Sequence, residues 1–160
     1  MLEEEIRKNV SLANLDAVAD GLVIDPGREF QVANEYRKAL NIRCAGIEQP
    51  VVNLSGGNQQ KVVLSKWLFT QPELLILDEP TRGIDVGAKY EIYTIIDRLA
   101  REGKGILMIS SELPELLGTC DRIYVMNEGR FVAEFTAAEA TQERIMHAIV
   151  RAGSTVHVAA

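Results

Sequence analysis

The sequence is poor in the features that mark secreted, membrane-spanning and metal-binding proteins. It holds only two cysteines, Cys44 and Cys120, in 160 residues, and neither has the spacing of a metal site or a redox pair, so we expect free buried thiols. No apolar run approaches the ~20 residues that a transmembrane helix needs. The first five residues, 1–5, are acidic where a secretion signal is basic. We therefore expect a cytoplasmic protein.

Positive charge and histidine are also scarce. Lys and Arg number 17 against 23 Asp and Glu, which gives a formal net charge of −6. Because a nucleic-acid backbone repels a chain of this sign, we expect no nucleic-acid partner. His147 and His157 lack a second ligand three or four residues away, so they predict no metal site. Apolar residues are plentiful at 47% of the chain, a proportion typical of a packed globular domain.

The first part of the chain, residues 1–72, predicts an α-helical subdomain. Apolar residues recur at helical spacing up to about Gln49, with a break at 25–27 and no strand pattern between. A further helix is expected from about Asn58 to Thr70. Trp67 lies on an apolar stripe of that helix, and we expect it in the core.

From residue 73 the pattern changes to strands that alternate with helices, which is typical of a parallel α/β sheet. The strands are expected at 74–78, 105–110, 122–126 and 131–135, and the longest helix at 86–101. Asn127-Glu128-Gly129-Arg130 predicts a hairpin between the last two strands. Thr136 and Glu139 match a capping box for a final helix. Residues 73–153 thus form the α/β part, and we expect 154–160 to be a disordered tail.

Two short motifs carry chemistry that suits phosphate. In 54–61, Leu-Ser-Gly-Gly-Asn-Gln-Gln-Lys, adjacent glycines open an apolar helix, and their unshielded N–H groups at the positive end of the helix dipole favour an anion. In 74–81 an apolar strand ends in Asp78 and Glu79, one acid for a magnesium ion and one for a water. The plainer alternatives are a helix start capped by Ser55 and a solvated acidic turn. The buried strand argues against the acidic turn, because ligands bind at the carboxyl edge of such sheets.

With the continuation 82–89, Arg-Gly-Ile-Asp-Val-Gly-Ala-Lys, these motifs resemble those of ATP-binding cassette (ABC) ATPases. The resemblance is to the second ATPase half of the tandem-cassette subunits of bacterial monosaccharide importers of the ribose, galactose and xylose type, and it runs from about Ile6 to Val150. It implies an α/β fold, the C-terminal part of a P-loop NTPase (RecA-like) core with parallel strands and a C-terminal hairpin, preceded by the helical subdomain. It implies an ATPase in the intact protein, with ATP and Mg²⁺ as cofactors.

The same resemblance implies partners and a location. The partners are a second ABC cassette, membrane permease subunits and, indirectly, a sugar-binding protein. The location is the cytoplasmic side of the cell membrane, with the protein peripheral on its inner face. The identity of the sugar is not encoded in this part of such proteins.

The resemblance also assigns roles to single residues. The signature motif, which in the family faces the γ-phosphate of ATP bound to the opposite cassette, consists of Ser55, Gly56, Gly57, Asn58 and Gln59. Asp78 corresponds to the acid that holds magnesium, usually through water, and Glu79 to the acid that orients or deprotonates the attacking water. Asp85 matches the loop that couples the two cassettes. It is also suited to capping a helix that starts at Val86, and we expect both roles.

The sequence departs from the family at two places. A phosphate loop needs Gly-x-x-x-x-Gly-Lys-Ser/Thr, and the only Gly-Lys pair, at 103–104, has Arg98 and Gly105 where the first glycine and the hydroxyl should stand. We therefore expect a partial core that begins beyond the phosphate and glutamine loops and leaves an unpaired slot between the strands at 105–110 and 122–126. Such a chain is predicted to be marginally stable or self-associating.

Ser111 is the second departure, because it occupies the place where most cassettes carry a histidine that contacts the γ-phosphate. A neutral hydroxyl lacks that charge-tunable contact, so we expect the site built on Glu79 to be slow though not inactive. The signature motif belongs to the partner's site, which does not need Ser111. We therefore expect this chain to contribute mainly by completing that site.

Three functions compete at this point. The first is the C-terminal fragment of the ATPase subunit of a sugar importer. The second is a truncated, catalytically inactive cassette that serves as a dimerisation module, and the third is a non-transport ABC protein acting in DNA repair or translation. The residues 82–89 and the lack of basic stripes favour the importer over the third.

Overall fold

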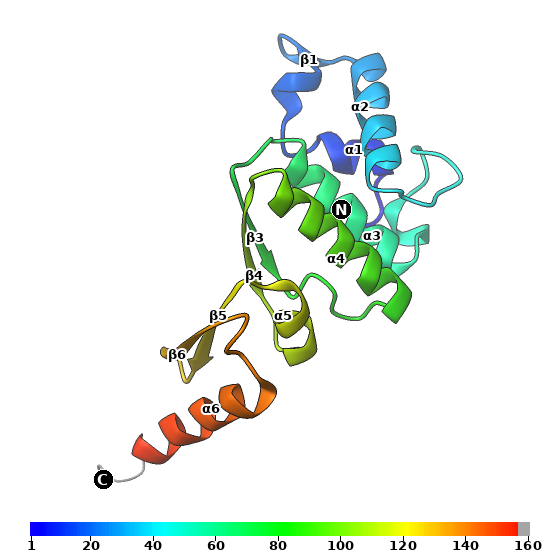
Figure 1. The fold of residues 1–160 in the computed structure, drawn as a ribbon. Helices are drawn as coiled ribbons and strands as arrows, with labels where there is room; N and C mark the ends of the chain where they lie inside the picture. Colours follow the sequence, from blue (N-terminus) through cyan, green and yellow to red (C-terminus); the bar gives the residue numbers. More distant parts are fainter. Residues whose placement is uncertain (157–160) are drawn as a thin grey trace. The chain divides into compact units, whose positions relative to one another are not determined.

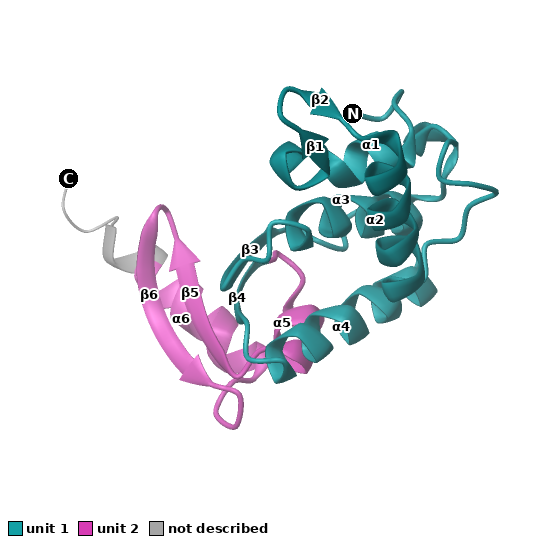
Figure 2. Ribbon diagram, turned by 90° about the horizontal axis from the view of Figure 1, so that it is seen from above, with its two compact units in different colours: residues 1–109 teal, residues 110–160 magenta. Residues whose placement is uncertain are grey.

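The computed structural model describes residues 1–156, which fall into two compact units that divide after Ile109 (Figure 2). In the first unit the elements are α1 (Ile6–Ser11), a 3-10 turn (Leu15–Val18), β1 (Ala19–Asp20), β2 (Val23–Ile24), α2 (Pro26–Ala39), a second 3-10 turn (Val51–Asn53), α3 (Gly56–Leu68), β3 (Leu74–Asp78), α4 (Val86–Arg101) and β4 (Gly105–Ile109). In the second they are α5 (Leu113–Thr119), β5 (Arg122–Asn127), β6 (Arg130–Thr136) and α6 (Gln142–Val156) (Figure 1). Within these residues no helix is both long and apolar enough to cross a membrane.

The helical part of the first unit is built on α1, α2 and α3, which share one core. Ile6 and Val10 of α1, Ala33 of α2 and Val62 of α3 are all buried in it. Our expectation of helices without strands up to Gln49 was wrong in two places. Gly21, with a φ of +62°, makes a tight turn that lets β1 and β2 pair as a short antiparallel hairpin. The second error is that α2 ends at Ala39 and the residues that follow form a loop.

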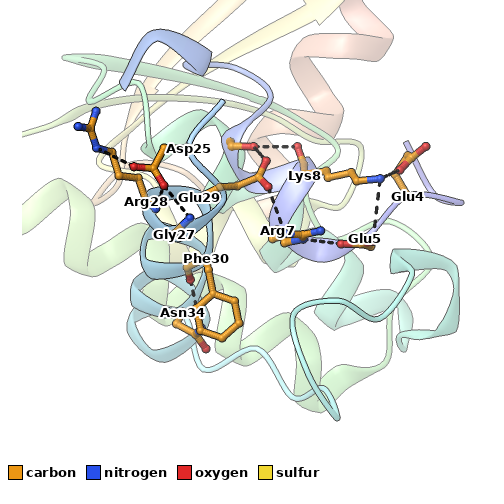
Figure 3. A network of polar contacts seen from close by, with 11 residues as sticks. Glu4, Glu5, Arg7, Lys8, Asp25, Gly27, Arg28, Glu29, Phe30 and Asn34 are labelled. Atoms are coloured by element: carbon orange, nitrogen blue, oxygen red, sulfur yellow. Dashed lines mark hydrogen bonds and ion pairs between the residues drawn. The ribbon is translucent and has the colours of Figure 1, made fainter. Parts of the chain in front are cut away.

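A buried carboxylate joins α1 to α2 (Figure 3). Glu29 is 6% exposed, accepts a hydrogen bond of 2.8 Å from the Ser11 hydroxyl and lies 3.7 Å from the Arg7 guanidinium. Asp25 precedes α2, and its side chain accepts hydrogen bonds from the backbone N–H groups of Gly27 and Arg28. The capped break at 25–27 and the ion contact therefore fix where α2 begins and how it meets α1.

Removal of the Ser11 hydroxyl should destabilise this part measurably. We expect Ser11→Ala to lower the free energy of unfolding by about 1.5 kcal/mol, because Glu29 loses a hydrogen-bond donor inside the core. Urea unfolding followed by the fluorescence of Trp67, the only tryptophan, would report it. Lys8→Ala, which removes an exposed ion pair with Glu4, is the matched control and should change stability by less than about 0.5 kcal/mol. If Ser11→Ala and Lys8→Ala lower the free energy of unfolding equally, the buried contact stabilises the protein no more than the exposed ion pair does.

The α/β part of the first unit is a parallel two-stranded sheet covered on one face. β3 and β4 pair in register from Leu74 with Gly105 to Asp78 with Ile109, as a parallel sheet was expected to. Side chains of β3 alternate, so that Leu75 and Leu77 are buried while its other apolar residues are exposed. α4 ends as expected, with Gly103 in the left-handed region at a φ of +91°.

The apolar stripe of α3 was partly misread. Trp67 is 50% exposed and Val63 is 46% exposed, so Trp67 is not a core residue. The buried face of the helix carries Leu64 and Leu68 together with Lys61. Two stripes at i, i+4 spacing lie side by side on this helix, and the sequence alone does not say which one faces the core.

The second unit confirms the hairpin and corrects the start of the last helix. β5 and β6 pair antiparallel, with a register shift at Val125 and Met126. α6 begins at Gln142, and the Thr141 hydroxyl accepts from the N–H of Arg144, so Thr141 is its cap. Thr136 and Glu139 do bond to one another, but within a turn that precedes the helix. Of the predicted tail, residues 154–156 lie in α6, and 157–160 lie outside the described residues.

Among the strands that the structure describes, β4 pairs only with β3, and β5 only with β6. The predicted parallel sheet is thus one pair, and the predicted C-terminal hairpin is another. Leu74, Ile76, Leu107 and Ile109 leave the second face of the parallel pair exposed and apolar.

Candidate functional site

The start of α3 presents uncapped backbone N–H groups. Ser55 has extended backbone angles, with φ −62° and ψ 154°, and stands at the N-cap position, but its side chain makes no capping hydrogen bond. The amides of the first turn therefore have neither a helical partner nor a side-chain cap. Ser55 and Gly56 are exposed. Ser55 is thus the N-cap residue, as in the plain alternative of a capped helix start, but its hydroxyl is not used up as a side-chain cap.

Two signature residues use their side chains inside the protein. Asn58 accepts a hydrogen bond from the backbone N–H of Arg43 at 2.9 Å and donates one to the Ser55 hydroxyl at 2.9 Å. Gln59 donates to the carbonyl of Leu54 at 3.0 Å. These contacts hold the segment that leads into α3, so any phosphate contact by Asn58 or Gln59 has to come from atoms that these bonds leave free.

The two glycines let the start of α4 and the segment before it come close to α3. A Cβ atom added to Gly57 would lie 2.4 Å from the Cβ of Ala88, and one added to Gly56 would lie 3.2 Å from a methyl of Ile84. Gly57 is buried. Sequence reasoning explained this glycine by the approach of a phosphate, and the structure gives it an additional reason, the close packing of α3 on α4.

Asp85 caps α4. Its carboxylate accepts a hydrogen bond of 3.0 Å from the N–H of Ala88, which confirms the capping role expected from the sequence. Because Ala88 also touches Gly57, the cap of α4 and the start of α3 belong to one cluster. A groove of about 330 Å³ opens beside this cluster, where Gly56, Gln59 and Arg82 contribute to its lining.

The paired acids stand at the carboxyl end of β3. Asp78 is the last residue of the strand and is exposed, and Glu79 is half-buried with a φ of +46°, in the left-handed region that favours glycine. The N–H of Glu79 donates to the carbonyl of Ile109 at 2.8 Å, which holds this unusual conformation against β4. The chain therefore turns sharply between the two acids, and strained backbone of this kind is often found at functional sites.

The carboxylates at the end of β3 suit magnesium only if a bound nucleotide supplies further ligands. Within the described residues no group of three or more His, Cys, Asp or Glu side chains could hold a metal ion. Magnesium, however, is commonly bound by one or two carboxylates together with substrate phosphates and water. The exposed Asp78 carboxylate fits that role, and the ion would supply positive charge near the phosphates.

Ser111 belongs to the second unit, in the segment that joins β4 to α5. It is exposed. Its neighbour Ser110 bonds to the buried carboxylate of Glu115 and accepts from the N–H of Glu112 at 3.0 Å. The segment that carries Ser111 is thus held by hydrogen bonds of its own unit.

Sequence reasoning missed a charged cluster behind the signature motif. Lys61, 2% exposed, donates to the carboxylate of Glu91 and to the carbonyl of Asn41 at 2.9 Å, and Arg43 donates to Glu91 at 2.8 Å. The cluster ties α3, α4 and the loop after α2 together. The sequence places Lys61 on the same face of α3 as Leu64 and Leu68, but it does not show that this face is buried, and only a buried lysine needs an acidic partner.

The cluster predicts a pH dependence. The hydrogen bond from Lys61 lowers the pKa of Glu91 below its ordinary value of 4.5. A carboxyl whose pKa is lower in the folded state stabilises the protein above its unfolded pKa, and this contribution is lost as the pH falls through the folded pKa. We expect the urea midpoint of Glu91→Gln to lie below that of the unchanged chain at about pH 7 and to approach it at about pH 3. A constant difference across this range would contradict the expectation.

Comparisons with known proteins show which family the chain is similar to. The family model described as "ABC transporter" matches residues 3–82. The chain is 58% identical over 151 residues to the L-arabinose transport ATP-binding protein AraG of Geobacillus stearothermophilus, a match that covers 94% of this chain and 29% of that protein. It is also 58% identical to the xylose import ATP-binding protein XylG of Geobacillus kaustophilus, over 91% of this chain and 29% of that one. The chain thus spans under a third of the length of these relatives.

Solved structures show the same fold at low sequence identity. An inward-facing metal-chelate type ABC transporter matches with a TM-score of 0.79 at 15% identity, over 93% of this chain and 59% of that one. A dimeric ATP-binding cassette in a post-hydrolysis state with ADP and Pi matches with a TM-score of 0.71 at 22% identity, over 86% and 58%. The fold is therefore a partial α/β ATPase cassette, as the sequence predicted.

Proposed function

The chain belongs to the ABC transporter family, and from that premise we propose that it is the part of a monosaccharide importer's ATP-binding subunit that supplies the signature motif to a second cassette. Its relatives are named for L-arabinose transport and xylose import, which supports a monosaccharide as the cargo. Because the chain spans 29% of these relatives, the coupling of ATP hydrolysis to transport is proposed for the protein of which this chain forms one part.

The observation that carries the proposal is the uncapped first turn of α3. Ser55 is exposed there, its side chain makes no capping bond, and the amides of Gly56 and Gly57 stand at the positive end of the helix dipole. A hydroxyl and N–H groups that lack a helical partner can together bind the oxygens of a γ-phosphate. No Gly-x-x-x-x-Gly-Lys-Ser/Thr loop occurs in the sequence, so the remaining phosphate contacts must come from another cassette.

The other site residues take the roles that the family suggests. Asp78 would hold Mg²⁺, which would supply positive charge near the phosphates, and Glu79 would orient or deprotonate the attacking water of the chain's own ATP site. Ser111 takes the place of a γ-phosphate contact there and makes that site slow. Asp85 couples the two cassettes in addition to capping α4, and its position next to the start of α3 supports this role.

The proposal includes partners and a place in the cell. A second cassette is the direct partner, and the dimeric cassette of similar fold supports this. Membrane permease subunits and, indirectly, a sugar-binding protein complete the importer, which would place the chain on the cytoplasmic face of the membrane. A cassette without turnover that only dimerises is the second candidate, favoured by the absent phosphate loop and by Ser111.

Nucleotide titration of the 160-residue chain tests the proposal. We expect Mg-ATP to bind with a Kd in the millimolar range or weaker, because the signature motif alone makes few phosphate contacts. Isothermal titration calorimetry would measure this, and addition of a cassette that carries a phosphate loop should tighten binding. Sub-micromolar affinity of the chain alone would contradict the view that its nucleotide site is completed from elsewhere.

A further inference from the structure

We infer that Asn58 is a positioning residue, whose side-chain amide fixes the Ser55 hydroxyl as a hydrogen-bond donor toward the nucleotide phosphate. The inference rests on the proposed function, and it gives Ser55 and Asn58 different roles. Ser55 touches the phosphate, whereas the Asn58 side chain acts through Ser55.

The chemistry of the two hydrogen bonds determines the direction of the hydroxyl. The backbone N–H of Arg43 can only donate, so the Asn58 atom 2.9 Å from it has to be the carbonyl oxygen. The Asn58 atom 2.9 Å from the Ser55 hydroxyl is then the NH₂ group, which can only donate. Ser55 therefore accepts from Asn58, and its single hydrogen has to point elsewhere.

The free hydrogen has an obvious direction. Ser55 is exposed and stands directly before the uncapped amides of α3. Among the described residues its hydroxyl donates to no protein acceptor. An anion at the start of α3 would therefore receive the hydroxyl hydrogen as well as the backbone N–H groups.

The Arg43 N–H that orients Asn58 is itself held in place. The Arg43 guanidinium donates to Glu91 at 2.8 Å, and Glu91 also accepts from the buried Lys61. Lys61 donates in addition to the carbonyl of Asn41, in the same loop as Arg43. The donor thus lies on a loop that is fastened to α3 and α4, so Asn58 has one stable orientation.

A double-mutant cycle in the intact transporter, reconstituted with its permease, tests the inference. We expect Ser55→Ala to lower kcat for ATP hydrolysis about 100-fold and Asn58→Ala about tenfold. The double variant should be no slower than Ser55→Ala alone, because Asn58 has nothing left to orient. If the double variant is slower than the unchanged protein by the product of the two single-variant losses in kcat, the inference is wrong.

Asn58→Asp is the second variant and preserves the volume of the side chain. One carboxylate oxygen still accepts from Arg43, but the other now accepts the Ser55 hydrogen and turns it away from the phosphate. We expect a loss close to that of Ser55→Ala, and little further loss when Asp is combined with Ser55→Ala. If Asn58→Asp lowers kcat by the same factor in the unchanged protein and in the Ser55→Ala variant, the negative charge of Asp acts without Ser55, and the inference is wrong.

The outcomes distinguish a failure of the proposed function from a failure of the role inferred for Asn58. If Ser55→Ala leaves hydrolysis unchanged, the proposed function fails and this inference fails with it. If Ser55→Ala is slow but the losses multiply, only the role of Asn58 is wrong. Thermal unfolding of each variant, expected to stay near that of the unchanged protein, distinguishes lost positioning from lost folding.

Discussion

Replacement of Ser55 by alanine in the intact transporter should lower sugar-stimulated ATP hydrolysis about 100-fold, and more than Glu79→Gln does. In the proposed function the hydroxyl and the amides at the start of α3 stabilise charge on the phosphate in the partner's site, and the loss of one preorganised donor at such a site costs ~10²–10³ in rate. By the same proposal Glu79 serves the chain's own ATP site, which is expected to be slow already, so its loss should change total turnover less.

Steady-state ATPase assays with and without sugar would provide the comparison. Thr94→Ala is a suitable control, since Thr94 is an exposed hydroxyl on α4 that bonds only to the preceding turn. It should leave the rate within about twofold of the unchanged protein. The reverse ranking, with Glu79→Gln the slower variant, would mean that this chain acts chiefly through its own ATP site.

Gly57→Ala should be the most destabilising small substitution in the first unit. Its new methyl would lie 2.4 Å from the Cβ of Ala88, so α3 and α4 would have to move apart. Overpacking of this kind costs roughly 1–3 kcal/mol, and because the contact is between two rigid helices we expect about 2–3 kcal/mol. Urea unfolding of the 160-residue chain, followed by Trp67 fluorescence, would measure the loss.

Two further variants show whether the helix contact is the cause. Ala88→Gly, made in the Gly57→Ala background, should recover most of the lost stability because it removes the atom that clashes. Gly56→Ala should cost less, since its methyl would lie 3.2 Å from the Cγ2 methyl of Ile84 and 3.7 Å from the carbonyl oxygen of Gly83, both longer contacts than the one at Gly57. A neutral Gly57→Ala would falsify the close approach of the two helices.

The elements of the α/β part could be read from the sequence because their signals are local. The strand 74–78 and the helix 86–101 were predicted with the bounds that β3 and α4 have, since an apolar run, a capping aspartate and Gly103 mark their ends. The β1–β2 hairpin was not predicted, because each strand has only two residues and no alternating pattern. The exposure of Trp67 depends on which of two stripes packs inward, and that is decided by tertiary contacts.

The site was predictable as a set of motifs but not as a set of contacts. The motif spacing identified Ser55, Asp78 and Asp85, and the structure gave Asp85 the capping bond that was expected. The use of the Asn58 side chain by Arg43 could not be foreseen, because the two residues lie 15 positions apart and a loop brings them together. Glu91 was missed for the same reason, since its partner Lys61 lies 30 positions away.

The contact between Gly57 and Ala88 has a mechanical consequence. The Ala88 methyl group packs against Gly57, so α3 and α4 lie close together at this point, and the hydroxyl of Ser55 sits two residues from the contact while the carboxylate of Asp85 sits three residues from it. We therefore expect a displacement that a neighbouring subunit imposes on Asp85 to shift Ser55 as well, because both residues flank the same close-packed contact between α3 and α4.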